Sequence, residues 1–404
     1  MHHEETEQIC PAMVLKEALM HRCRTALIYS PLFGNFNYGD DHPFKLQRNR
    51  LAFDLMDAYG LLDLPGMVIR NCLPIDDDLV LTFHDQAYID RLKEFSVSDE
   101  PRADFRFGLG DAECPVFKGL YDCAALGAGA TFEAVRMVEE GFDVAFNLAG
   151  GWHHAHRAKA SGFSYINDAV IAINWLLTRG RRVVYLDIDA HHGDGVQEAF
   201  YDTDQVLTIS LHESGIYFFP GTGFEDETGV GAGRGYSVNI PLLACSDDAI
   251  YMKAFDEAAY PLIVAFKPDI IVAQIGADTF RTDPLTRLEI TTHSYGDIIC
   301  KIRELKIPLV ALGGGGYDLM NTARAWTLAW SIMNGVELNP RLPPSFIAKI
   351  EPLGYPHRVL LDAMHWAEEA ERKLALDAVE KSIACIRKSI FPGIIGSHGA
   401  TKGQ

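Results

Sequence analysis

The stretch that decides the fold is Tyr185-Leu-Asp187-Ile-Asp189-Ala-His191-His192-Gly-Asp194-Gly. It overlaps the end of an apolar, β-branched run, Arg182–Ile188, and places carboxylates and imidazoles where that run stops. The run is hydrophobic at consecutive positions, which is typical of a parallel strand covered on both faces. Asp187 and Asp189 are two residues apart and therefore point to the same side of the strand.

Further runs of the same kind predict six more strands: Thr25–Tyr29, Asp143–Asn147, Val206–Leu211, Tyr236–Ile240, Ile270–Ile275 and Leu309–Leu312. Helical spacing of small and apolar residues predicts helices over Asp122–Glu139, Asn167–Leu177, Ser246–Phe266 and His357–Ser389. Because strands and helices alternate, we expect an α/β fold with a mainly parallel sheet. No Pro-, Ser- or Gly-rich linker divides the 404 residues. We therefore expect a single domain over 25–389, with an N-terminal extension (1–24) and a C-terminal tail (390–404).

The composition constrains partners and compartment. The formal net charge is −19, from 55 acidic and 36 basic residues, so the chain repels nucleic acid and anionic membranes and attracts cationic substrates. The same acidic excess also serves solubility alone. The eight cysteines are scattered without a C-x-x-C pair, which indicates reduced thiols. The N-terminus is too polar for a secretory signal, and no apolar run approaches the roughly 18 residues of a membrane span. We expect a cytoplasmic protein.

Sites in parallel α/β sheets form at the carboxyl ends of strands. Besides the stretch quoted above, three strand ends carry polar groups: Asn147-Leu-Ala-Gly-Gly-Trp-His153-His154-Ala-His156, Gln274-Ile-Gly-Ala-Asp278-Thr and Ala311-Leu-Gly-Gly-Gly-Gly316-Tyr317. Asp189, His191 and Asp278 together offer oxygen and nitrogen ligands, which suit zinc, and three protein ligands leave the metal open to water and substrate. Alone, Asp278 would be read as a helix cap, and the histidines as surface residues. That reading does not explain D-x-D-x-H-H-G-D-G.

Other strand-end residues suggest acid–base chemistry. The tandem His153-His154 after two glycines indicates proton transfer beside a metal site. The carboxylates of Asp187 and Asp194 are suited to accept imidazole N–H groups and set the tautomers. Tyr317 follows a glycine run that lacks the lysine of a phosphate loop, and its hydroxyl can serve as a donor to a developing oxyanion.

At this point the residues resemble a known family, the zinc-dependent histone deacetylase superfamily, which includes acetoin-utilisation proteins and acetylpolyamine deacetylases. The resemblance covers roughly residues 25 to 330 and is nearest to the class I-like branch with its bacterial members. It rests on motifs in family order: G-G-W-H-H-A, G-F-S-Y-I-N-D, Y-L-D-I-D-A-H-H-G-D-G-V, T-I-S-L-H, F-F-P-G-T-G, G-A-D-T and G-G-G-G-Y. It implies an arginase/deacetylase-like three-layer fold with about eight strands. It also implies one zinc per chain and hydrolysis of acylated lysine in peptides or proteins.

The resemblance carries roles by position. It implies zinc ligands at Asp189, His191 and Asp278, with His154 as principal base and His153 assisting. Asp187 and Asp194 are then the histidines' carboxylate partners, and Tyr317 polarises the carbonyl. Around the acyl-lysine tunnel it implies that Phe163 and Phe219 form the aromatic walls, with Gly162 beside them. Leu285 falls at the rim of the tunnel, and Asp104 is the nearest candidate for the acidic residue that clamps the substrate there. Arg48 matches an arginine of the internal cavity. Potassium sites would comprise Asp187, Asp189, His191, Ser210 and Leu211 (inner) and Phe200, Thr203, Val206 and Tyr236 (outer).

Departures from the family pattern narrow the expectation. Leu285 is not the acidic gatekeeper of polyamine specialists, and Pro284 and Met320 replace the arginines that bind inositol phosphate in corepressor-bound enzymes. A single metal separates the chain from the arginases, which need a second set of carboxylates. Three functions stay open: a protein lysine deacylase, a small-molecule amidohydrolase such as an acetylpolyamine deacetylase or acetoin-utilisation protein, and a non-catalytic metal-bound module. The last would be favoured by a missing ligand, base or tyrosine, and none is missing.

Overall fold

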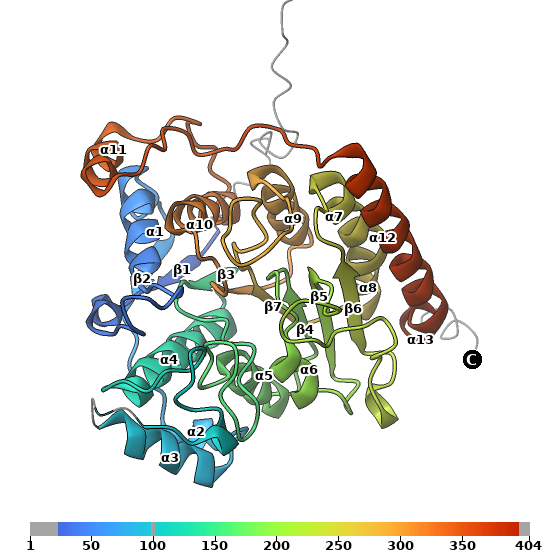
Figure 1. The fold of residues 1–404 in the computed structure, drawn as a ribbon, viewed down its shortest axis with the longest axis horizontal. Coiled ribbons are helices and arrows are strands. Elements are labelled where there is room, and N and C mark those ends of the chain that lie inside the picture. Colours follow the sequence, from blue (N-terminus) through green and yellow to red (C-terminus); the bar gives the residue numbers. More distant parts are fainter. Residues whose placement is uncertain (1–22, 98–99, 101, 396–404) are drawn as a thin grey trace, which may run out of the picture.

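A computed structural model describes residues 23–97, 100 and 102–395, and places the strands in one sheet (Figure 1). Within these residues the sheet has eight strands in the order β2-β1-β3-β8-β7-β4-β5-β6, and every pairing is parallel. The strands are β1 Thr25–Ile28, β2 Met67–Arg70, β3 Val144–Asn147, β4 Val183–Asp187, β5 Val206–Glu213, β6 Ser237–Leu242, β7 Ile270–Gln274 and β8 Leu309–Leu312. The predicted α/β fold with a parallel sheet is confirmed. Most of the expected extension and tail, 1–22 and 396–404, lies outside the described residues.

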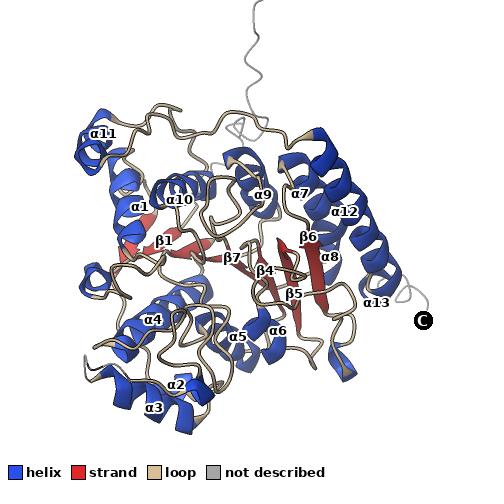
Figure 2. Ribbon diagram, viewed as in Figure 1, coloured by secondary structure: helices blue, strands red, loops and turns tan. Residues whose placement is uncertain are grey.

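Helices cover both faces of the sheet (Figure 2). One face packs against α1, α9 and α10, and the other packs against α4, α5 and α6. The central strands contribute to both cores alternately, so that Leu186 of β4 belongs to one core and its neighbour Tyr185 to the other. The helices are α1 Gln47–Ala58, α2 Asp77–Val80, α3 Gln86–Ser96, α4 Leu120–Glu139, α5 Asp168–Thr178, α6 Asp194–Ala199, α7 Asp248–Ala254, α8 Tyr260–Phe266, α9 Thr292–Glu304, α10 Leu319–Met333, α11 Pro344–Ile350, α12 Glu369–Ser389 and α13 Phe391–Ile394.

Strand order brings the chemistry-bearing segments together. β3, β8, β7 and β4 are consecutive neighbours in the sheet, and each ends at one of the four polar strand ends. Pairing continues past the strands, because the N–H of Ile188 donates to Gln274 O (3.0 Å) and the N–H of Gly313 donates to Asn147 O (2.9 Å). The four segments therefore leave the sheet side by side, at one edge.

Two elements differ from the sequence-based expectation. The predicted helix over His357–Ser389 is wrong for its first part, because the helix begins at Glu369. The preceding segment bonds to the rest of the fold instead: Leu360 N–H donates to Pro340 O (2.7 Å), and Asp362 N–H donates to the hydroxyl of Thr292 (2.8 Å). Strand β2 was not predicted, because its four residues are half-buried or exposed and lack the continuous apolar signal.

The other helical predictions are confirmed. α4 and α5 match the expected spans closely. The expected helix over Ser246–Phe266 forms as α7 and α8 joined by a π-helical turn, Phe255–Ala259, and it begins where Asp247 accepts the Ile250 N–H (3.2 Å). No helix in the described part of the chain is long and apolar enough to cross a bilayer.

Candidate active site

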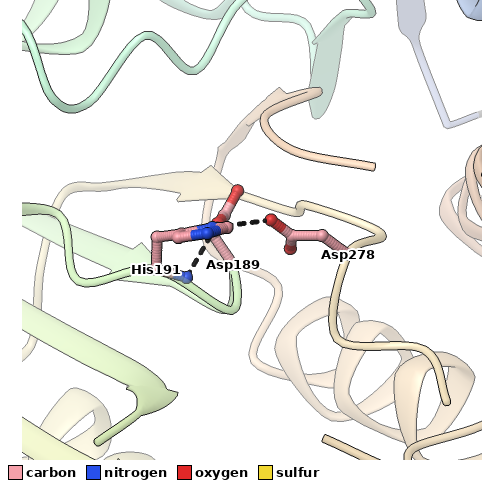
Figure 3. Close-up of side chains that lie close together, drawn as sticks. All are labelled: Asp189, His191 and Asp278. Carbon is pink, nitrogen blue, oxygen red and sulfur yellow. Dashed lines mark hydrogen bonds and ion pairs between the residues drawn. The ribbon is translucent and has the colours of Figure 1, made fainter. Parts of the chain in front are cut away.

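Asp189, His191 and Asp278 converge beyond the ends of β4 and β7 (Figure 3). All three are buried, and their ligand atoms lie within 4.8 Å of one another. Nδ1 of His191 is 2.9 Å from Asp278 Oδ2 and 3.1 Å from Asp189 Oδ1. Tetrahedral zinc with bonds of about 2.0–2.1 Å separates its ligand atoms by about 3.3 Å, so His191 Nδ1 already lies close to the required distance from both carboxylate oxygens.

Electrostatics at this cluster call for a cation. Two carboxylates that are both buried repel each other unless positive charge compensates. Burial and the neighbouring Asp189 raise the pKa of the Asp278 carboxyl. Burial opposes ionisation of Asp189 as well, yet the imidazoles of His153 and His191 hold the pKa of Asp189 well below its usual range. A bound divalent ion would supply the missing positive charge for both carboxylates, so the donor set fits zinc.

The carboxylate oxygens that face away from His191 Nδ1 are held by hydrogen bonds from the protein, and of the two that face it, Asp189 Oδ1 also accepts the His191 N–H (2.9 Å). Asp189 Oδ2 accepts from Gln274 Nε2 (2.6 Å) and from the N–H of Gly315 (2.7 Å), while Asp278 Oδ1 accepts from Ala190 N–H (2.8 Å). Gly315 is required here, because a Cβ at that position would lie 2.1 Å from Asp278 Oδ2. The glycine run after β8 therefore allows the backbone to reach the ligands.

The tandem histidines each have a carboxylate partner, as the sequence predicted. His153 Nδ1–H donates to Asp187 Oδ2 at 2.7 Å, and His154 Nδ1–H donates to Asp194 Oδ1 at 2.7 Å. Their ring centroids are 4.0 Å apart, and the His154 ring is 5.9 Å from the His191 ring in an edge-on arrangement. Since Nδ1 carries the hydrogen in both, Nε2 is the nitrogen each histidine has left for chemistry.

The two histidines differ in basicity. Burial and the adjacent His153 lower the pKa of His154 to about 4. Burial would also lower the pKa of His153, but Asp187 and Asp189 raise it to about 9. One imidazole of the pair is therefore neutral and the other protonated at neutral pH, which gives the site one proton acceptor and one proton donor.

A cavity beside the metal ligands is lined by histidines, glycines and aromatic rings. Its lining includes Phe163 and Tyr317, whose rings meet edge to face at 5.7 Å. Phe219 lies edge-on to His154 at 4.9 Å. Gly162 fits between them: a Cβ there would stand 2.4 Å from His154 Cδ2 and 2.8 Å from Phe219 Cε1. The structure thus brings together the predicted tunnel walls, the base and Tyr317.

Arg48 also lines this cavity. Its guanidinium donates to Gly316 O (2.9 Å) and Gly314 O (2.5 Å) and lies over the Phe44 ring at 4.2 Å. The Nε–H is buried without a partner among the described residues. Burial lowers the pKa of Arg48 to about 10, so the side chain stays cationic at neutral pH. An unpaired donor on a cationic side chain suits a small anion such as a carboxylate.

Two predicted substrate residues, Asp104 and Leu285, are not among the residues that line this cavity. Asp104 pairs with Arg106 (2.8 Å) and Arg91 (3.3 Å), in a loop whose Phe107 O accepts the N–H of Ala160. Leu285 is half-buried, and its N–H donates to Asp283 Oδ1 (3.0 Å).

The residues expected at the potassium sites occupy the β4–β5 region. Asp187 and Ser210 are register partners on β4 and β5, and Tyr236 O accepts the Thr208 N–H (3.0 Å) just before β6. Thr203 N–H donates to Phe200 O (3.4 Å) in the turn that precedes β5. These residues lie on β4 and β5 or in the segments beside them.

Three supporting residues were not predicted. The Tyr185 hydroxyl donates to Asp187 Oδ2 (2.7 Å), and Gln274 holds Asp189 as described above. Asp283 accepts the backbone N–H groups of Tyr317 (2.7 Å) and Asp318 (3.3 Å). Tyr185 and Gln274 both lie in strands that end at the site, which is a signal the sequence offers. Asp283 gives none, because its partners lie 34 and 35 residues away.

Comparison with known proteins agrees with this geometry. A family model described as "Histone deacetylase domain" matches residues 42–333. The chain belongs to the histone deacetylase family. It is 40% identical to Histone deacetylase B of Dictyostelium discoideum over 325 residues, which is 80% of this chain and 76% of that protein. It is also 40% identical to Histone deacetylase RPD3 of Saccharomyces cerevisiae, over 79% of this chain and 74% of the relative. As a member of this family, the chain is a hydrolase of the deacetylase class.

Solved histone deacetylase homologues share the fold. The crystal structure of an HDAC homolog from Aquifex aeolicus aligns with a TM-score of 0.81 and 33% identity, covering 89% of this chain and all of that one. An HDAC homolog complexed with SAHA aligns with a TM-score of 0.80 and 34% identity over the same shares. The predicted deacetylase-like fold is confirmed, and so is the resemblance from which it came.

Proposed function

We propose that this histone deacetylase is a zinc-dependent hydrolase that removes acetyl or other acyl groups from the side-chain amide of lysine in peptides and proteins. One observation carries the proposal: the metal-ligand cluster, a neutral histidine and a tyrosine hydroxyl surround one aromatic-lined cavity. The geometry supports Asp189, His191 and Asp278 as the ligands that would hold zinc.

Each remaining residue has a defined task in the proposed reaction. When bound, zinc lowers the pKa of water and polarises a carbonyl oxygen. His154 is neutral at pH 7 and accepts the proton of water at Nε2, since Nδ1–H is held by Asp194. His153, whose pKa is raised to about 9, donates a proton to the departing amine. Burial and Asp278 raise the pKa of Tyr317 well above its usual range, so its hydroxyl stays protonated and donates to the carbonyl oxygen as charge develops.

The residues around the cavity support an acyl-lysine substrate. Phe163 and Phe219 provide apolar walls suited to an alkyl chain, and the net charge of −19 favours a cationic substrate. Arg48 is suited to receive the carboxylate product, because its Nε–H has no partner in the described chain. The acidic charge equally suits an acetylpolyamine, which is therefore the alternative substrate in the test below. Leu285 disfavours this alternative, because polyamine-specific members of the family carry an acidic residue at that position.

We also propose two further features. Potassium, bound mainly through main-chain oxygens, is proposed for the strand region of Asp187, Ser210 and Tyr236; the pairing of Asp187 with Ser210 on adjacent strands supports it. A cytoplasmic location is proposed because the described residues contain no disulfide, which is the state that reducing compartments maintain.

The function is tested with a panel of lysine peptides that carry different acyl groups, run beside N-acetylputrescine on zinc-loaded protein. We expect hydrolysis of at least one acyl-lysine peptide and its loss when a chelator removes the metal. Faster turnover of N-acetylputrescine would instead assign a small-molecule amidohydrolase. Zinc at one equivalent without hydrolysis of any substrate would leave a metal-bound binding module and refute the enzyme.

A further inference from the structure

Asp194 lies between two imidazoles rather than one. Its Oδ1 accepts the Nδ1–H of His154 at 2.7 Å, and its Oδ2 lies 3.5 Å from Nε2 of His156. The other nitrogen of His156, Nδ1, hydrogen-bonds to Glu198 Oε2. This His154–Asp194–His156–Glu198 series runs from a side chain that is 6% exposed to one that is 55% exposed. It therefore links the proposed base to the protein surface.

Local structure holds the series in place. Asp194 and Glu198 are four residues apart on α6 and face the same side of that helix. His156 sits at the start of a tight turn in which its N–H donates to Lys159 O (2.9 Å). The Gly195 N–H donates to His153 O (3.0 Å), which fastens the start of α6 to the histidine segment. A side-chain change at His156 therefore leaves the backbone contacts between these two segments intact.

We propose that His156 is a positioning residue for the deacylation reaction: as an imidazolium it pairs with Asp194 on the side opposite His154 and holds the carboxylate where it orients that base. The inference rests on the proposed function. Apart from His156, the donors to Asp194 in the described chain are the His154 Nδ1–H (2.7 Å) and the Gly195 N–H (2.9 Å). Both act on Oδ1, so the carboxylate keeps some freedom to turn about its Cβ–Cγ bond. A second donor on the other oxygen removes that freedom and keeps Oδ1 aimed at His154 Nδ1.

The surroundings favour the charged form of His156. Hydrogen bonds to Asp194 and Glu198 raise the pKa of His156 to about 9, although burial acts in the opposite direction. The other titratable groups nearby are Arg157, the next residue, and Lys159 across the turn, with His84 bonded to Arg157 O (3.2 Å). Burial lowers the pKa of His84 to about 4, so it is neutral. The His156 imidazolium thus persists at neutral pH and is lost as the pH rises through about 9.

The first experiment compares kcat and KM of His156→Gln and His156→Lys with the wild type from pH 7.5 to 10, on the acyl-lysine peptide that the panel selects. Removing an outer-shell partner of a metal-site residue typically costs 10- to 100-fold, so we expect about a tenfold lower kcat for His156→Gln at pH 7.5, with KM and zinc content unchanged. The ratio of wild-type to variant kcat should fall towards 1 above pH 9. His156→Lys keeps a cation beside Asp194 and should recover most of the kcat.

A matched control is available in His365→Gln. His365 pairs with Glu289 at 2.5 Å, and its side chain is 26% exposed, as is that of His156. This control should leave kcat unchanged at every pH. A wild-type to His156→Gln ratio that stays constant across the pH range, or a kcat equal to wild type, would overturn the positioning role.

The second experiment needs no substrate, so it separates failure of this inference from failure of the proposed function. NMR of the zinc-loaded protein follows the His156 ring nitrogens and the His154 Nδ1 proton. We expect His156 to titrate near pH 9, and the His154 Nδ1 proton to shift or broaden in His156→Gln but not in His365→Gln. Titration of His156 near its ordinary value of about 6.5, or an unchanged His154 signal, would refute the positioning role even in an active enzyme. Absence of turnover by the wild type, with both NMR signatures present, would refute only the proposed function.

Discussion

Replacement of Tyr317 by Phe tests the proposed chemistry most directly. The ring's neighbours are retained, because Phe163 and His191 contact the ring at 5.7 and 6.3 Å between centroids. The backbone at this position is held independently by the Asp283 carboxylate. No hydrogen bond in the described chain occupies the Tyr317 hydroxyl, so its removal leaves no buried partner unpaired. We therefore expect the free energy of unfolding to change by less than about 1 kcal/mol.

The catalytic effect should be much larger. A single donor to a developing oxyanion is worth roughly 100- to 1,000-fold in kcat, or about 2.7–4 kcal/mol. We expect that loss for Tyr317→Phe, measured by steady-state hydrolysis of an acyl-lysine peptide, with zinc content by metal analysis unchanged. Tyr59→Phe is the matched control, since its hydroxyl donates to Asn339 O and Arg341 O at the surface. Turnover by Tyr317→Phe within a few-fold of wild type would contradict the role given to its hydroxyl.

Three further predictions follow from the site and the core. Zinc at about 1,000 times its Kd should stabilise the fold by about 4 kcal/mol in urea unfolding, and Asp278→Asn should lose most of that gain; an equal gain in the variant would remove Asp278 from the ligand set. Gly162 has φ +50°, and a Cβ there would lie 2.4 Å from His154, so Gly162→Ala should lower kcat by about 100-fold without loss of zinc. Gly60→Ala is the control, because Gly60 also has a positive φ (+73°) but a Cβ there would meet open space, and its kcat should be unchanged. Equal kcat values for the two variants would contradict this packing argument. Burial lowers the pKa of His84 to about 4, below its unfolded value of about 6.5, so between these pH values the unfolded chain binds the extra proton. The free energy of unfolding therefore falls as the pH drops from about 6.5 to about 4, by about 1.4 kcal/mol per pH unit. In urea unfolding, the loss of stability between pH 7 and pH 5 should be smaller for His84→Gln than for the wild type, and an equal loss would exclude His84 as the cause.

Strands buried on both faces could be predicted from sequence, because each must be apolar at consecutive positions. All seven predicted strands form, with boundaries within two residues. The strand order could not be predicted, since β7 and β8 lie between β3 and β4, which precede them in the chain. The helix predicted for the segment before α12 does not form for a related reason. Hydrogen bonds from Leu360 and Asp362 to distant parts of the chain outweigh the helical periodicity of this segment.

The site residues also divide into those that could be predicted from sequence and those that could not. The charged residues at strand ends could be predicted, because a charged group directly after a buried apolar strand is costly unless it binds a metal or another polar group. Their outer partners depend on contacts between distant segments. Gln274 reaches Asp189 across 85 residues, and Asp283 reaches Tyr317 across 34. The pairing of Asp104 with Arg106 is local, yet the sequence gives no indication that the carboxylate is engaged there.

The position of β7 and β8 in the sheet sets the order in which the protein matures. During synthesis β3 and β4 emerge first, and each has an open side where a later strand will lie. Asp189 and His191 are then present without Asp278, which arrives only with β7. A nascent chain that ends before Ile270 lacks one ligand and the strand that aligns the others. Under the proposed zinc ligation, the complete ligand set exists only once Asp278 has been synthesised, and a fragment that ends before β7 would lack that ligand.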